Sequence, residues 1–211
     1  MTQQHALKDQ TLQPHEVQTI LLIASRILSY PEAIDEMVET ISESIDEQID
    51  DPELKKELTR ATQPLFVLPA RDLRELYVNT FDLKSKLGLY LTAHEFGDSP
   101  KRGAALIKLQ KIVNQTGFER EGEELADYIP MLLELLAVAP ELREDTRLYR
   151  RLAVAMQFMI DNIAMENPYG EILRVLTRHI FPEPTEEDIK EIEFNREEAD
   201  LEELPFPMMY Q

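Results

Sequence analysis

Apolar residues recur at helical spacing along most of the chain, and prolines separate the segments that carry them. Residues three or four positions apart fall on one face of a helix, so each segment predicts an amphipathic helix. The first of these stripes consists of Val17, Ile20, Leu21, Ala24, Ile27 and Leu28. Pro31 ends this segment, because the residue before a proline avoids the helical conformation.

Similar stripes continue to about residue 180, without period-2 alternation and without an Asn-Gly or Asp-Gly hairpin signal. We therefore expect an all-α fold, a single bundle-like domain of about eight to ten helices with an acidic C-terminal tail. The expected helices after the first cover about 32–49, 52–68, 70–81, 83–94, 100–116, 125–139, 146–164 and 172–180.

Local signals place several helix ends. Asp82 and Ser99 are expected N-caps, and a proline at 52, 100 or 130 suits the first turn of a helix. Gly117 suits a helix stop in the left-handed conformation.

The 211 residues suffice for one domain. We expect a flexible N-terminus over 1–13, a helical domain over 14–182 and an acidic tail over 183–211, which is dispensable for folding after Pro184. No run of about 18 apolar residues predicts a membrane span, and no secretory signal precedes the domain. The chain has no cysteine. These features predict a cytoplasmic protein without stable membrane association.

The net charge of −19 is concentrated in two segments. Residues 32–51 hold nine acids and no base, and residues 183–203 hold eleven acids and two bases, so each segment carries −9. This distribution argues against a nucleic-acid partner. Such a charge attracts cationic partners, although two solvated faces are the simpler explanation of it.

No catalytic or metal-binding signature is present, so no enzyme activity, cofactor or metal is expected. The four histidines are not helical neighbours, and His94-Glu95 lacks the second histidine of a zinc-protease motif. A nucleophile elbow, a phosphate loop and a dinucleotide fingerprint are also missing.

The stretch from Tyr77 to Leu136 holds the candidate binding residues. An aromatic face with acids at its rim could accept a cationic amphipathic helix, although the aromatics also suit the core. The candidates for this peptide site are Tyr77, Phe81, Asp82, Tyr90, His94, Glu124, Asp127, Tyr128 and Pro130. The turn before the helix at 100 could instead hold an anion on its backbone amides, or simply cap the helix. The candidates for this anion site are Asp98, Ser99, Lys101, Arg102 and Gly103.

The order YVNTFD, LYLTAH, GDSPKRGAAL and ELADYIPMLLELL, with LLIASRILSYP near the start, resembles the nitrate reductase delta-subunit family of NarJ-type chaperones. Those chaperones are relatives of the chaperones for trimethylamine-oxide and dimethyl-sulfoxide reductases. Glu124, Asp127 and Pro130 match the family pattern directly. Ala126 and Tyr128 stand where a proline and a histidine are common in related chaperones, so a histidine's role does not carry over.

The resemblance implies a system-specific assembly chaperone for nitrate respiration and assimilation that is not part of the finished reductase. Its partner would be the apo form of the nitrate reductase alpha subunit, bound at the N-terminal peptide, with cofactor-delivery proteins as further partners. Binding would support molybdenum cofactor insertion before membrane docking. The alternatives are a generic acidic adaptor for another basic helix and a small helical enzyme with an anion site at Asp98–Gly103.

Overall fold

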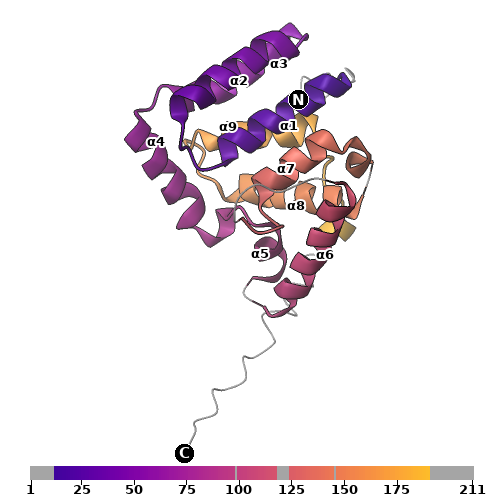
Figure 1. Ribbon diagram of the computed structural model, residues 1–211. Helices are drawn as coiled ribbons and strands as arrows, with labels where there is room; N and C mark the ends of the chain where they lie inside the picture. Colours follow the sequence, from indigo (N-terminus) through magenta and orange to yellow (C-terminus); the bar gives the residue numbers. More distant parts are fainter. Residues whose placement is uncertain (1–11, 98, 118–123, 145, 191–211) are drawn as a thin grey trace, which may run out of the picture.

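The computed structural model describes residues 12–97, 99–117, 124–144 and 146–190 (Figure 1). The all-α prediction is confirmed, because these described residues form helices and no strand. The α-helices are α1 (Pro14–Leu28), α2 (Ile34–Gln48), α3 (Pro52–Phe66), α4 (Ala70–Tyr77), α5 (Leu91–Phe96), α6 (Lys101–Gln115), α7 (Ile129–Val138), α8 (Arg147–Asn162) and α9 (Tyr169–His179). A π-helical turn at Val78–Asp82 and 3₁₀ turns at Ser85–Leu87 and Pro140–Arg143 join them.

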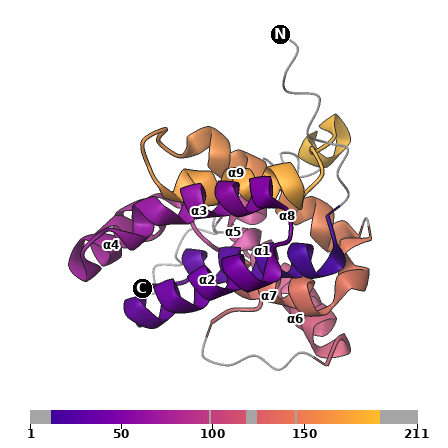
Figure 2. The ribbon, with the colours of Figure 1, turned by 90° about the horizontal axis from the view of Figure 1, so that it is seen from above.

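Helices α1 and α7 form the centre of the bundle and pack against each other. Helix α7 is apolar except for Glu134, and eight of its ten residues are buried, as expected for a central helix. Helix α1 also contacts α2 and α9, while α3 and α8 lie against α9 (Figures 1 and 2). The hydroxyl of Ser25 on α1 donates to Glu134 on α7 at 3.0 Å, so the one carboxylate within α7 has a partner.

Several predicted helix ends are confirmed. Helix α3 begins at Pro52, and the carboxylate of Asp51 accepts the N–H of Glu53 at 2.8 Å. Pro130 lies in the first turn of α7. Gly117 follows α6 with a φ of 73°, a conformation that costs glycine little.

The expected helix over 83–94 with Asp82 as its N-cap is wrong. The chain leaves α4 through the π-helical turn that ends at Asp82, and α5 begins only at Leu91. Tertiary contacts decide this, because Leu87 and Leu89 between the two helices are buried in the core.

Glu16 joins the start of α1 to the connection between α2 and α3. Its carboxylate accepts the N–H groups of Gln13, Asp50 and Asp51 at 3.0 to 3.1 Å. Burial raises the pKa of Glu16, but these three hydrogen bonds outweigh it, and the pKa lies below its usual range.

In the part of the chain that the structure describes, no helix is both long and apolar enough to cross a membrane. Of the expected tail, residues 186–190 form a helical turn, and residues 191–211 lie outside the described residues. Residues 1–11 of the expected N-terminal segment also lie outside them.

Candidate functional site

Two segments far apart in the sequence meet in a short antiparallel bridge between Tyr90 and Tyr128. The N–H of Leu91 donates to the carbonyl of Asp127 at 2.9 Å. Because α5 and α7 begin directly after the bridged residues, the bridge fixes their first turns beside each other.

The side chain of Asp127 is 0% exposed and forms the centre of a polar cluster. Its Oδ2 accepts the N–H of Thr92 at 3.2 Å and also the Thr92 hydroxyl. Arg102 Nη2 lies 3.5 Å from the same oxygen, and Arg102 Nε donates to Thr92 Oγ1 at 3.0 Å. Among the described residues, Asp127 Oδ1 accepts no hydrogen bond. This cluster joins α5, α6 and the start of α7.

Tyr90 links the cluster to the surface. Its hydroxyl donates to Glu124 at 2.7 Å, and the guanidinium carbon of Arg102 lies 5.8 Å from the centre of its ring. Burial and the hydrogen bond to Glu124 raise the pKa of Tyr90 far above neutral pH. The phenol is therefore a hydrogen-bond donor and no acid or base in this pH range.

Tyr77 and Phe81 belong to an aromatic group in the core. Their ring centres lie 5.1 Å apart, and Tyr169 packs 4.8 Å from Phe81 in an edge-on arrangement. The Tyr77 hydroxyl donates to the carbonyl of Leu28 at 3.2 Å, where α1 ends. Burial raises the pKa of Tyr77, so it also stays neutral.

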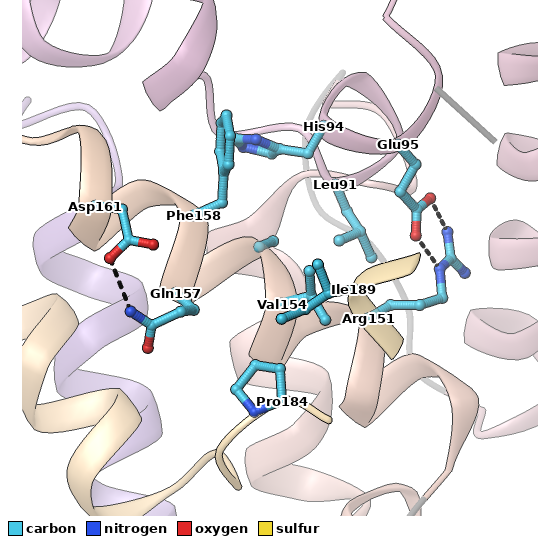
Figure 3. A pocket seen from close by; sticks show the side chains of 11 residues that line it. Leu91, His94, Glu95, Arg151, Val154, Gln157, Phe158, Asp161, Pro184 and Ile189 are labelled. Carbon is cyan, nitrogen blue, oxygen red and sulfur yellow. Dashed lines mark hydrogen bonds and ion pairs between the residues drawn. The ribbon is translucent and has the colours of Figure 1, made fainter. Parts of the chain in front are cut away.

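A pocket of about 220 Å³ lies between α5 and α8, and we call it the α5–α8 pocket (Figure 3). Its apolar lining includes Leu91, Val154 and Phe158. His94 lines it as well, with its ring centre 5.8 Å from that of Phe158. Nε2 of His94 donates to the carbonyl of Gly88 at 2.7 Å, which fixes the ring at the pocket wall.

Arg151 and Glu95 form one end of this pocket (Figure 3). The guanidinium donates two hydrogen bonds to the two carboxylate oxygens, and both side chains are largely buried. On the other side of this pair, a groove of about 650 Å³ runs between α6 and α8. The basic residues that line it are Lys101, Lys108, Arg147, Arg150 and Arg151.

The structure distributes the predicted peptide residues over different environments. Tyr77, Phe81 and Pro130 are buried in the core, and only Asp82 and Glu124 are exposed. The expectation that Asp127 lies at an open rim is wrong, because its side chain is 0% exposed and its Oδ2 is bound by Thr92 and Arg102. Tyr90 and Tyr128 are half-buried, with ring centres 5.5 Å apart. His94 reaches the α5–α8 pocket.

The predicted anion residues are also separated. Ser99 Oγ accepts the N–H of Lys101 at 3.2 Å, although α6 begins one residue later than expected and its N-cap residue is Pro100. Arg102 turns inward to Asp127, and Gly103 is exposed. Asp98 lies outside the described residues. Nor do the described residues hold a group of three or more acidic, histidine or cysteine side chains that could bind a metal ion.

Sequence reasoning missed Thr92, Arg151 and Phe158. Thr92 lies 35 positions from its partner Asp127, and Arg151 lies 56 positions from Glu95. No local pattern marks such pairs. The only signal was that Thr92 stands inside the motif LYLTAH.

A family model described as "Nitrate reductase delta subunit" matches residues 31–165. The nitrate reductase molybdenum cofactor assembly chaperone NarJ of Escherichia coli (strain K12) is 32% identical over 126 residues, which cover 57% of this chain and 52% of that protein. A Bacillus subtilis (strain 168) NarJ, named as a probable chaperone of the same kind, is 31% identical over 105 residues, covering 49% of this chain and 56% of that protein. The chain thus spans about half the length of these curated relatives.

The fold also resembles a solved structure. The crystal structure of a candidate redox enzyme maturation protein from Archaeoglobus fulgidus superimposes with a TM-score of 0.55 and 19% sequence identity. The match covers 82% of this chain and 97% of that one. At this identity the likeness concerns the fold alone.

Proposed function

Because the chain belongs to the nitrate reductase delta-subunit family, we propose that it is an assembly chaperone for a respiratory nitrate reductase. In this proposal the chain binds the apo form of the catalytic alpha subunit at its N-terminal segment. It keeps that subunit competent for molybdenum cofactor insertion and then leaves before the reductase docks on the membrane. The observation that carries the proposal is the family match over residues 31–165, supported by the names of the NarJ relatives.

The α5–α8 pocket supports binding of a helical segment. A helix presented to a groove inserts apolar side chains spaced three or four residues apart. Val154 and Phe158 have this same spacing on α8, and Leu91 faces them from α5. A pocket with this apolar lining can accept one or two side chains from a client helix.

The charge of the protein supports a cationic client. The buried residues of α2 are Met37, Ile41 and Ile45, so its many acids face solvent. Exposed acids contribute little affinity each, but their combined field speeds the approach of a basic segment and favours it over an acidic one. The apolar pocket would supply the affinity and the acidic surface the selectivity.

The test is the metal content of the reductase. Cells that lack this chain should still make the reductase polypeptide, but the purified enzyme should lack molybdenum cofactor. Restoring the wild-type gene should restore molybdenum. A reductase with a full molybdenum complement from the deletion strain would contradict the proposal.

A second experiment separates this function from a generic adaptor for basic helices. The protein, used as bait in nitrate-respiring cells, should retain the apo-reductase. Binding of a synthetic peptide from the N-terminus of the catalytic subunit, followed by calorimetry, tests the finer statement about where the client is recognised. A scrambled peptide of equal charge is the control.

A further inference from the structure

The chain crosses its own α5–α8 pocket after α9. Phe181 is still buried, but residues 182–190 are exposed or half-exposed. Pro184 and Ile189 from this segment line the pocket together with Leu91 and Val154 (Figure 3). The segment 184–190 therefore forms one wall of the pocket, and we call it the C-terminal segment.

A local capping arrangement gives the C-terminal segment its shape. The N–H of Thr185 donates to Asp188 Oδ2 at 3.1 Å, and the N–H of Asp188 donates to Thr185 Oγ1 at 3.2 Å. This reciprocal pair starts the helical turn at 186–190. The turn directs Ile189 toward the pocket.

Among the described residues, an ion pair to α8 and the side chain of Ile189 connect the segment to the domain. Asp188 lies 3.5 Å from Arg150 on α8, and the Arg150 side chain is 47% exposed. Ile189 remains 37% exposed even though it lines the pocket. The Asp188 side chain is 14% exposed, but its partner Arg150 stays open to water, so the ion pair is screened and contributes little. An element with little buried apolar surface belongs to the part of a fold that opens most easily.

The surface beneath the segment is different. Leu91, Val154 and Ala155 are buried and apolar, and the Glu95–Arg151 pair fixes α5 against α8 at one end. The walls of the α5–α8 pocket that α5 and α8 supply are therefore held in place without the C-terminal segment. These walls form a buried apolar surface beneath the weakly held C-terminal segment.

We propose that the C-terminal segment 184–190 is a displaceable lid on the α5–α8 pocket, and that the apolar face of a client helix takes its place. The identity of this competitor rests on the proposed function, whereas the lid itself does not. The C-terminal segment and a client helix would bind in the same way, because the segment already places an apolar side chain from a helical turn in the pocket. A lid that is closed nine-tenths of the time would weaken the apparent affinity for a client about tenfold.

The first experiment measures lid opening without a client. The chain has no cysteine, so Val154→Cys in the full chain introduces a single thiol beneath the lid. Asp188→Ala, which removes both the cap and the contact with Arg150, should speed labelling of this thiol several-fold. Glu187→Ala is the matched control, because it removes the same charge from an exposed neighbour in the same turn and should leave the rate unchanged.

Equal rates of thiol labelling at position 154 in the Asp188→Ala and Glu187→Ala chains would contradict the proposal of a lid. If Val154→Cys does not fold, Ala155→Cys supplies a thiol in the same pocket, and thermal unfolding of each variant identifies such a failure.

The second experiment adds the synthetic peptide from the N-terminus of the catalytic subunit. The Asp188→Ala chain should bind it several-fold more tightly than the Glu187→Ala chain, and the peptide should slow labelling of the thiol at position 154. Faster labelling of Asp188→Ala without any peptide binding would support the lid and count against the proposed function. If both chains bind the peptide equally and are labelled equally fast, the proposed function is supported and the proposal of a lid is contradicted.

Discussion

Arg151 on α8 donates two parallel hydrogen bonds to Glu95 on α5, and this buried pair separates the α5–α8 pocket from the basic groove between α6 and α8. The side chain of Glu95 is 4% exposed. Removing one partner from such a pair leaves the other charge buried without compensation.

Glu95→Ala should therefore lower the free energy of unfolding by about 3–5 kcal/mol. Chemical denaturation measures this loss. Glu39→Ala removes an exposed acid from α2 and should change stability by less than about 0.5 kcal/mol. Equal stabilities of the two variants would show that the pair contributes little.

Replacing Asp127 should mainly lower the stability of the fold, because its side chain is buried. Asp127→Ala removes the acceptor for Thr92 and Arg102 and should cost about 3 kcal/mol, whereas Asp127→Asn keeps an acceptor oxygen and should lose less. Thermal or chemical unfolding ranks the two variants. An Asp127→Ala chain as stable as the wild type would mean that the cluster does not hold the helices together.

Phe81→Ala should destabilise the fold by about 3–5 kcal/mol, because it removes a ring that packs against Tyr77 and Tyr169. Leu83→Ala is the control two residues away, where the side chain is 71% exposed. Denaturant unfolding of both variants is the measurement. A stable Phe81→Ala chain that releases the client faster would instead assign Phe81 to the binding surface.

Glu16 should make stability depend on pH. Its pKa is lowered in the folded state, so its contribution is complete above the usual carboxyl range and is lost as the pH falls through the depressed value. Glu16→Gln should cost about 1–3 kcal/mol at neutral pH, and this difference from the wild type should shrink in acid. Free energies of unfolding between pH 7 and pH 3 test this. A difference that does not change with pH would rule out the carboxylate's charge as the cause.

A chain that ends at Pro184 should keep nearly the wild-type thermal midpoint. The described residues after Pro184 bury little apolar surface, so their loss should not disturb the bundle. Calorimetry measures the midpoint and the cooperativity of unfolding. Loss of cooperative unfolding would show that the tail is part of the core.

The sequence alone determined the helical class and many helix ends. Helical spacing fixes which face of each helix is apolar, while Pro52, Gly117 and Pro130 act through their own backbone restrictions. These effects depend on the local sequence and not on which elements pack against each other in the fold. The motif order also sufficed to identify the family, and the family match confirms it.

Only the tertiary structure decided which polar groups are buried and what they contact. In the expected helix over 125–139, Asp127 would lie in the first turn as a solvent-facing acid. In the structure it precedes α7, and the bridge between Tyr90 and Tyr128 brings Thr92 to it from 35 positions away. In the same way Ile189, in a strongly acidic segment, reaches a pocket lined by α5 and α8. Periodicity identifies the buried face of a helix but not the surface it meets, because that surface depends on how the whole chain packs.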